Sequence, residues 1–202
     1  AIWIISCWET FGKPKNFNII ELGPGDGSLT NILLRSFKKF PDFDSIKKIF
    51  LFEKSNLLKK IQKRKIVSKD VKWINNFNEI KKGPVVFFGN EFFDAIPIKQ
   101  FIRKKGYLYE KYYLLNSDSE INEIHKKTSK RNYDMINSYS SLKSLKFIEF
   151  PKYGFKQLER ITNIIANQGG CILMIDYGYL KSHNQSTLQS VFKHKKNYIL
   201  NN

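Results

Sequence analysis

Three glycines at alternate positions form the stretch of the sequence whose residue types most directly suggest chemistry. The stretch reads Glu21-Leu22-Gly23-Pro24-Gly25-Asp26-Gly27, and it lies between an apolar run and a helical pattern. Glycine has no Cβ, so the backbone can turn tightly and approach a ligand closely. The N-terminus of the following helix offers free N–H groups and a positive partial charge. The pattern therefore predicts a strand, a glycine turn and a helix that bind a nucleotide-like ligand.

The spacing of the glycines distinguishes between two kinds of ligand. The dinucleotide fingerprint is G-x-G-x-x-G, but here Gly27 comes one position early and Ser28 stands in the place of that glycine. The observed spacing is similar to that of class I methyltransferases, which use S-adenosylmethionine (SAM). SAM has no pyrophosphate but carries a cationic side, which an acid such as Glu21 would suit. The alternative is a plain glycine turn without a ligand. The candidate cofactor-binding residues here are Glu21, Gly23, Pro24, Gly25, Asp26 and Gly27.

A second acid, Glu53, follows the next apolar run, residues 49–52. In doubly wound α/β folds, an acid at the end of the second strand accepts hydrogen bonds from ribose hydroxyls. An ordinary exposed loop acid is the alternative, but the position directly after four apolar residues argues against it. We therefore expect Glu53 to bind the ribose of the cofactor.

Asn90, Glu91 and Asp94 follow a third apolar run, residues 85–88. Ligands of open α/β sheets bind outside the carboxyl ends of the strands. Methyltransferases that act on amino nitrogens often carry a polar-Pro-Pro-aromatic motif here, which Asn90 and the aromatic residues 92–93 resemble and Glu91 breaks. Carboxylates suit a guanidinium, which stays protonated and pairs bidentately. We expect these three residues to be catalytic, with Asn90 also near the cofactor; a capping Asp94 and a loop Glu91 are the alternative.

Polar residues follow two further expected strands, and each could serve either ligand binding or a turn. Asn75 and Asn76 follow a short apolar run and would either contact the adenine edge or form a turn. Asp176 follows residues 171–175 and would either face the ligand edge or serve the turn before Gly178.

The elements that would position these residues alternate between strand and helix. Strands are expected over 17–22, 46–53, 71–74, 85–88 and 171–175, and helices over 1–11, 29–40, 55–64 and 153–168. Ser55 is the expected N-cap of the third helix, with Leu57, Leu58 and Ile61 on its inner face. This order predicts an α/β, Rossmann-like fold with a mostly parallel sheet flanked by helices.

The segment 101–150 interrupts this alternation. Residues 101–116 alternate as in a hairpin with a turn at 104–106, residues 118–144 are polar and weakly patterned, and residues 147–151 are short and extended. We expect an inserted, substrate-facing segment or lid within one domain, with 1–100 and 151–202 as the cofactor-binding core. Another strand is expected over 187–192, followed by a solvated basic stretch over 193–196.

The composition fits a globular domain and disfavours several classes of function. The chain has 202 residues and a formal charge of +17, which alone would suggest nucleic-acid binding. The lysines are spread along the chain without an aromatic-interleaved stripe, so the distribution argues against a nucleic-acid partner. No apolar run is long enough for a membrane span, and no signal peptide is visible. Because the first residue is not Met, we expect the sequence to be part of a longer chain.

The cysteines and histidines do not suggest a metal site. Cys7 and Cys171 lie in apolar contexts and are interpreted as reduced core cysteines. His125, His183 and His194 share no metal-ligand spacing with one another or with the cysteines.

Four motifs together resemble the MidA family of SAM-dependent methyltransferases. They are Glu21-Leu22-Gly23-Pro24-Gly25-Asp26-Gly27, Asn90-Glu91-Phe92-Phe93-Asp94-Ala95-Ile96-Pro97, Ile175-Asp176-Tyr177-Gly178 and Thr187-Leu188-Gln189-Ser190-Val191. The resemblance implies SAM binding through Gly23, Gly25 and Gly27, and a role near substrate for Asn90, Glu91 and Asp94. Mitochondrial members of that family are complex I assembly factors that methylate an arginine of a complex I subunit.

The expected function is therefore methyl transfer from SAM to an arginine nitrogen of a protein, linked to respiratory complex I assembly. The alternatives are a non-catalytic SAM-binding assembly chaperone, a nicotinamide-dependent oxidoreductase, and an RNA methyltransferase suggested by charge alone. We expect a cytoplasmic protein if the chain is bacterial and a mitochondrial matrix protein if it is eukaryotic. The sequence does not indicate an oligomeric state.

Overall fold

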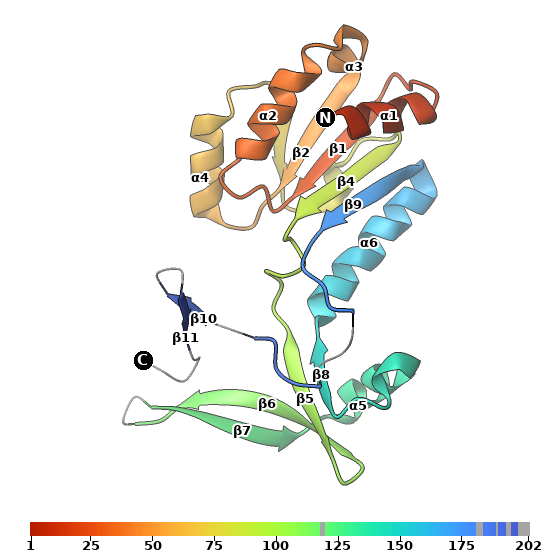
Figure 1. The fold of residues 1–202 in the computed structure, drawn as a ribbon. Coiled ribbons are helices and arrows are strands. Elements are labelled where there is room, and N and C mark those ends of the chain that lie inside the picture. The colour runs from red at the N-terminus through yellow and green to blue at the C-terminus, as the bar shows by residue number, and fades with distance from the viewer. Residues whose placement is uncertain (118–119, 181–183, 189, 193–194, 198–202) are drawn as a thin grey trace. The chain divides into compact units, whose positions relative to one another are not determined.

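The computed structural model describes residues 1–117, 120–180, 184–188, 190–192 and 195–197 (Figure 1). The chain divides into two compact units. The first consists of Ala1–Ile96 and Gly154–Gly178, and the second of Pro97–Tyr153 and Tyr179–Asn202. Separate clusters of buried apolar side chains lie in the two units.

A five-stranded parallel sheet forms the centre of the first unit. Its strands are β1 (Phe17–Leu22), β2 (Lys47–Phe52), β3 (Val71–Ile74), β4 (Val85–Asn90) and β9 (Gly170–Ile175). Their order in the sheet is β3-β2-β1-β4-β9, and every neighbouring pair is parallel. Every residue of β1 is buried, as expected for a strand covered on both faces. The structure confirms the predicted α/β fold and brings the carboxyl ends of β1, β2 and β4 to one edge.

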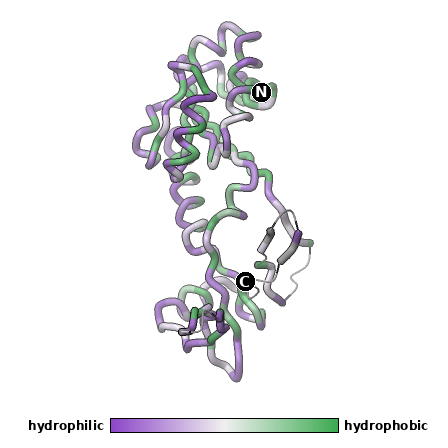
Figure 2. Tube along the Cα trace, turned by 90° about the vertical axis from the view of Figure 1, so that its left-hand side faces the viewer, coloured by the Kyte–Doolittle hydropathy of each residue, from purple (hydrophilic) through white to green (hydrophobic). Residues whose placement is uncertain are grey.

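Helices cover both faces of this sheet. The helices of the first unit are α1 (Ile2–Thr10), α2 (Ser28–Phe37), α3 (Pro41–Ile46), α4 (Asn56–Lys65) and α6 (Lys152–Gln168), with a 3₁₀ turn at Phe77–Glu79. Side chains of α1, α2 and α3 pack on one face, while Ile161 of α6 packs on the other. The helices mix hydrophilic and hydrophobic residues along their turns (Figure 2). In the described part of the chain, no helix has the length and apolar character needed to cross a membrane.

Two features of these helices differ from the sequence predictions. The first crossover helix ends at Phe37, and α3 forms separately with Pro41 in its first turn and the buried Phe43 against Phe37 at a ring-centroid distance of 5.0 Å. The inner face of α4 was predicted correctly only at Leu58, which is half-buried. Leu57 is 69% exposed and Ile61 39%, whereas Gln62 is fully buried. Gln62 is tolerated there because its side-chain amide is hydrogen-bonded.

The second unit contains a four-stranded antiparallel sheet in the order β7-β6-β5-β8. Its strands are β5 (Lys99–Lys104), β6 (Tyr107–Leu115), β7 (Ile121–Lys127) and β8 (Phe147–Phe150), and its helices are α5 (Lys130–Ser138) and the 3₁₀ turn Ser140–Leu142. The predicted hairpin with its turn at 104–106 is confirmed. Strand β7 was missed because it is a polar edge strand without fully buried residues. The core residues are Phe101, Leu108, Ile136, Ile148 and Phe150.

The chain beyond Gly178 groups with this second unit, whereas we expected 151–202 to belong to the cofactor-binding core. The reason is a set of side-chain hydrogen bonds to β5 and β8. Gln100 Nε2 donates to Ser186 Oγ at 2.8 Å, and Thr187 N donates to Glu149 Oε1 at 3.0 Å. Strands β10 (Ser190–Phe192) and β11 (Lys195–Asn197) pair antiparallel. His183, Gln189, Lys193 and His194 lie outside the described residues.

Candidate active site

The glycine turn connects β1 to α2 in a conformation that requires glycine. The φ angles are +64° at Gly23, +55° at Gly25 and +82° at Gly27, in the left-handed region that side chains disfavour. A Cβ on Gly27 would lie 2.8 Å from Ile66 Cδ1, whereas a Cβ on Gly25 would meet no heavy atom within 4 Å. Gly27 is therefore required for packing against α4, and Gly25 leaves open space beside the turn that a ligand could occupy.

Glu21 lies below this turn, on the side of β1 that faces α2. The residue is 4% exposed, and Thr30 Oγ1 donates a hydrogen bond to its carboxylate. Burial raises the pKa of Glu21 to about 7, and the hydrogen bond from Thr30 opposes that increase. The buried carboxyl group therefore contributes to the electrostatics beneath the turn from a position away from solvent.

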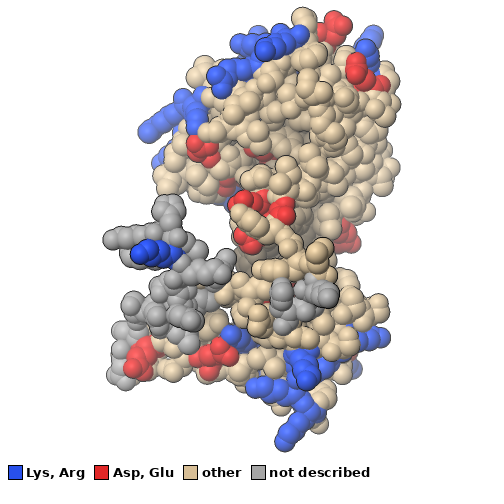
Figure 3. All heavy atoms as spheres, viewed as in Figure 1, with Lys and Arg blue, Asp and Glu red and all other residues tan. Residues whose placement is uncertain are grey.

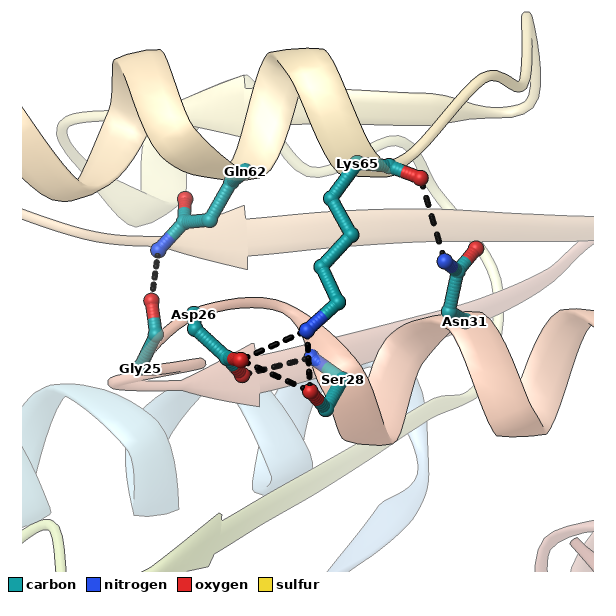
Figure 4. Close-up of polar contacts among 6 residues, drawn as sticks. All are labelled: Gly25, Asp26, Ser28, Asn31, Gln62 and Lys65. Atoms are coloured by element: carbon teal, nitrogen blue, oxygen red, sulfur yellow. Dashed lines mark hydrogen bonds and ion pairs between the residues drawn. The ribbon is translucent and has the colours of Figure 1, made fainter.

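Asp26 fixes the outer side of the turn to the C-terminal end of α4 (Figure 4). Its carboxylate accepts hydrogen bonds from Lys65 Nζ at 2.6 Å and from Ser28 N at 2.9 Å. These contacts, with the one from Ser28 Oγ, hold the pKa of Asp26 well below its usual range. Asn31 Nδ2 also donates to Lys65 O at 3.0 Å. The turn, the start of α2 and the end of α4 thus form one hydrogen-bonded assembly.

Glu53 lies at the end of β2, beside the glycine turn. Gly23 N donates to Phe52 O at 3.0 Å, which joins the ends of β1 and β2. Glu53 is 8% exposed, and its Oε1 accepts from Lys54 N and Ser55 N at 2.8 Å each. Its other oxygen, Oε2, accepts from Gln62 Nε2 at 3.3 Å. The predicted ribose acid and the predicted cofactor turn therefore lie together, and the ribose contact remains a prediction.

Gln62 is a residue of this site that the sequence did not indicate. Its Nε2 donates to Gly25 O at 2.7 Å as well as to Glu53, and its Oε1 accepts from Trp73 Nε1 at 2.8 Å. Trp73 and Gly25 are 11 and 37 residues away along the chain. No local pattern of α4 marks a helix position whose partners are this distant.

Asn90 is the last residue of β4, and Glu91 and Asp94 lie in the loop that follows it. Glu91 has a φ of +54°, an uncommon value for a residue with a side chain, and its N–H donates to Ile175 O at 2.7 Å. Asp176 Oδ2 accepts from Phe93 N at 3.0 Å and from Asp94 N at 3.1 Å. Asp176 therefore holds the backbone of this acidic loop, a role that neither of its sequence interpretations included.

The acidic side chains of this loop share one region with Tyr177. Glu91 acts most strongly on Tyr177, and together with Asp94 and Asp176 it raises the pKa of the tyrosine hydroxyl. Tyr177 itself is 77% exposed. Figure 3 shows a group of acidic side chains at this end of the first unit. The arrangement can bind a cation from solvent.

Phe92 connects the acidic loop to the glycine turn. A Cβ on Gly23 would lie 3.2 Å from Phe92 Cδ2, and one on Gly89 would lie 3.1 Å from Phe92 Cβ. The ring also packs edge-on against Phe52, at a centroid distance of 6.3 Å. The last residue of β2, the glycine turn and the acidic loop thus contact a single aromatic side chain.

The remaining candidates have structural partners of their own. Asn76 caps the 3₁₀ turn Phe77–Glu79, and Asn75 Oδ1 accepts from Lys59 Nζ at 2.6 Å. The sulfurs of Cys7 and Cys171 are 3.6 Å apart, and burial raises the pKa of Cys171 to about 12. Among the described residues, no three His, Cys, Asp or Glu side chains are placed to hold a metal ion.

Comparison with known proteins identifies relatives of the whole chain. Residues 1–202 match the family described as "Putative S-adenosyl-L-methionine-dependent methyltransferase". The Xenopus tropicalis protein named "Protein arginine methyltransferase NDUFAF7, mitochondrial" is 26% identical over 228 residues, which cover 100% of this chain and 52% of the relative. The Caenorhabditis elegans homologue is 25% identical with the same coverage. The human protein is 30% identical over 128 residues, which cover 50% of this chain and 28% of the relative.

A solved structure shares the fold. It is that of a methyltransferase-like protein from Burkholderia thailandensis bound to S-adenosyl-homocysteine, with a TM-score of 0.73 and 14% identity. The match covers 96% of this chain and 51% of that protein, so the chain spans about half the length of its relatives. The resemblance drawn from the four motifs is confirmed: the chain belongs to this family of SAM-dependent methyltransferases.

Proposed function

We propose that the protein transfers a methyl group from SAM to a guanidino nitrogen of an arginine in a protein substrate. The observation that carries this proposal is that Phe92 joins, within one unit, a glycine turn with open space beside Gly25 and an acidic loop in which Glu91 has a positive φ. The printed names of the relatives, which are protein arginine methyltransferases, support the same reaction.

The residues around the glycine turn fit the cofactor. The open space beside Gly25 admits a ligand against the backbone, and Gly23, Gly27, Pro24 and Asp26 would line the turn that holds it. Glu53 Oε2 would accept from a ribose hydroxyl, since Oε1 is already bonded to the backbone. Glu21 would favour the cationic side of the ligand from below, and Asn90 would lie near it. When bound, SAM supplies a methyl group activated by the sulfonium.

The acidic loop would bind and orient the acceptor. Glu91 and Asp94 would pair with the guanidinium and hold one nitrogen toward the cofactor, while Asn90 offers an amide beside them. The same carboxylates would accept the proton that the methylated nitrogen gives up. Asp176 and Tyr177 hold and surround this loop, so the contribution of the chain is orientation and electrostatics.

The partner is proposed to be a subunit of respiratory complex I or of its bacterial counterpart. The arginine side chain is the chemical feature that the acidic loop would recognise. We place the reaction in the cytoplasm of a bacterial cell, or in the mitochondrial matrix of a eukaryotic cell; the names of the relatives print "mitochondrial".

Glu91→Gln separates substrate orientation from cofactor binding. The variant should bind SAM as the wild type does in calorimetry but lose transfer of a labelled methyl group to arginine-containing complex I subunits. The matched control is Glu9→Gln, because Glu9 is an exposed acid of α1 that pairs with Lys13. This variant should retain both SAM binding and methyl transfer. Equal loss of binding and transfer in Glu91→Gln would contradict this division of roles, and tight binding of NAD in place of SAM would overturn the proposal.

A further inference from the structure

We propose that Gln62 is a positioning residue that fixes the glycine turn and Glu53 relative to each other, and so sets the affinity for SAM. This inference rests on the proposed function, because the turn and Glu53 are the groups expected to hold different parts of the cofactor. Gln62 is a side chain of α4 that forms hydrogen bonds with both groups.

The contacts of Gln62 use both polar atoms of its amide. The residue is fully buried. Its Nε2 lies 2.7 Å from Gly25 O and 3.3 Å from Glu53 Oε2, and its Oε1 lies 2.8 Å from Trp73 Nε1. A buried amide with these partners has no low-energy alternative arrangement, because turning it would leave buried polar groups unpaired.

Trp73 determines which way the amide points. The indole N–H is a donor only, so the atom that faces it must be the amide oxygen. The amide nitrogen must then face the two acceptors, the carbonyl of Gly25 and the carboxylate of Glu53. Strand β3, which carries Trp73, thereby fixes the orientation of a side chain that contacts the turn after β1 and the acid after β2.

The stem of Gln62 also supports the turn by packing. A Cβ on Gly27 would lie 3.4 Å from Gln62 Cγ, so the side chain lies directly beneath the third glycine. Figure 4 shows Gln62 and Lys65 reaching from α4 to the turn at two points, Gly25 and Asp26. Lys65 is an exposed ion-pair partner, whereas Gln62 is the buried contact that also reaches Glu53.

The oxygen that Gln62 contacts is the one Glu53 would use for a ribose. Oε1 of Glu53 is occupied by Lys54 N and Ser55 N, so the position of Oε2 depends on Gln62. A hydrogen bond to a charged group contributes about 1.5–3 kcal/mol, which corresponds to roughly tenfold or more in affinity. Without Gln62, the turn and the carboxylate would each be ordered separately when the cofactor binds.

The test compares Gln62→Leu with Gln157→Leu in the full-length protein. Gln157 on α6 is 1% exposed, and its Nε2 has no hydrogen-bond partner among the described residues. It therefore provides the same substitution at a buried site on α6, which packs on the sheet face opposite to α1, α2 and α3. We expect the dissociation constants for SAM and S-adenosyl-homocysteine, measured by calorimetry, to rise about tenfold or more in Gln62→Leu and less than about twofold in Gln157→Leu.

Two further measurements distinguish positioning from general stability. The KM for SAM should rise in Gln62→Leu while kcat at saturating SAM stays within about twofold. In a double-mutant cycle, the substitution Glu53→Gln should reduce the affinity for SAM by a smaller factor in the Gln62→Leu variant than in the wild-type protein. If Gln62→Leu does not fold, Trp73→Phe keeps an aromatic ring but removes the indole N–H that orients the amide, and it should weaken binding in the same direction.

Unchanged SAM affinity in both Gln62→Leu and Trp73→Phe would overturn the inference, as would strict additivity with Glu53→Gln. Failure of the proposed function gives a different result. If the wild type binds SAM but transfers no methyl group to arginine, the reaction is wrong while the affinity test still decides the role of Gln62. If the wild type binds neither SAM nor S-adenosyl-homocysteine, both proposals fail.

Discussion

The buried carboxyl group of Glu21 links stability to pH. Burial raises its pKa from 4.5 to about 7, so the folded protein binds more protons than the unfolded chain between these values. Stability from this group is therefore highest below about pH 4.5, falls as pH rises, and is fully lost above about pH 7. Each pKa unit corresponds to ~1.4 kcal/mol, so the ionised group destabilises the fold by about 3 kcal/mol.

Glu21→Gln removes this ionisation while keeping the shape of the side chain and an oxygen near Thr30. We expect the variant to be more stable than the wild type by about 3 kcal/mol at about pH 8, with the difference shrinking toward zero near pH 4.5. Urea denaturation at the two pH values measures it. The exposed residue Glu9 supplies a control, Glu9→Gln, that should show no such trend. An equal difference at both pH values would show that the ionisation of Glu21 is not its cause.

At the scale of elements, Asp176 at the end of β9 holds the acidic loop after β4. It accepts the N–H groups of Phe93 and Asp94, so Asp176→Ala leaves both without this acceptor and releases the loop. A displacement of about 1 Å at reacting groups can lower rates by roughly 100-fold. We therefore expect methyl transfer to fall by at least about tenfold in Asp176→Ala, with SAM affinity within about twofold of the wild type.

The conservative variant Asp176→Asn tests whether geometry is responsible. Its amide oxygen can still accept one of the two hydrogen bonds, so it should lose less activity than Asp176→Ala under the same labelled-methyl assay. If the two variants lose equal activity, the negative charge of Asp176 matters more than its support of the loop.

The elements of the sheet that could be predicted from the sequence are those whose residues form a short apolar run. Strands β1, β2, β3, β4 and β9 read as short apolar runs ending in polar residues, so their place in a parallel sheet followed directly. Strand β7 could not be recognised, because an edge strand with exposed polar side chains lacks that pattern. The buried face of α4 was misjudged, since hydrophobicity favoured Leu57 and Ile61 while hydrogen bonding decided for Gln62.

In the candidate site, the residues that could be predicted are those required by the backbone turn and those at the ends of strands. Gly23, Gly25 and Gly27 all adopt the left-handed conformation that their spacing implied, and Glu53 and Glu91 lie at strand ends as expected. The support of these residues was not predictable. Gln62, Trp73 and Phe92 act through contacts between elements, and such contacts leave no local pattern.

At the scale of the whole molecule, the contact between Cys7 and Cys171 shows whether the first and last elements of the first unit are packed together. Cys7 lies on α1, the first helix, and Cys171 on β9, the last strand of the parallel sheet, yet their sulfurs are 3.6 Å apart. Burial raises the pKa of Cys171 to about 12. At about pH 8, a much smaller share of Cys171 would then be the reactive thiolate than in an unfolded chain, where a cysteine has a pKa of about 8.5.

Labelling of Cys171 should therefore follow unfolding of the first unit. In Cys7→Ala, where Cys171 is the only remaining thiol, the effects of Cys7 on its pKa are lost and partial burial remains, so we expect a disulfide reagent at pH ~8 to react at least about tenfold more slowly in buffer than in concentrated urea. Trp3, Trp8 and Trp73 all lie in the first unit, so tryptophan fluorescence and Cys171 labelling should share one urea midpoint. Labelling that precedes the fluorescence change would mean that β9 separates from α1 before the rest of the sheet unfolds, because the thiol would then be exposed while the tryptophans remain packed.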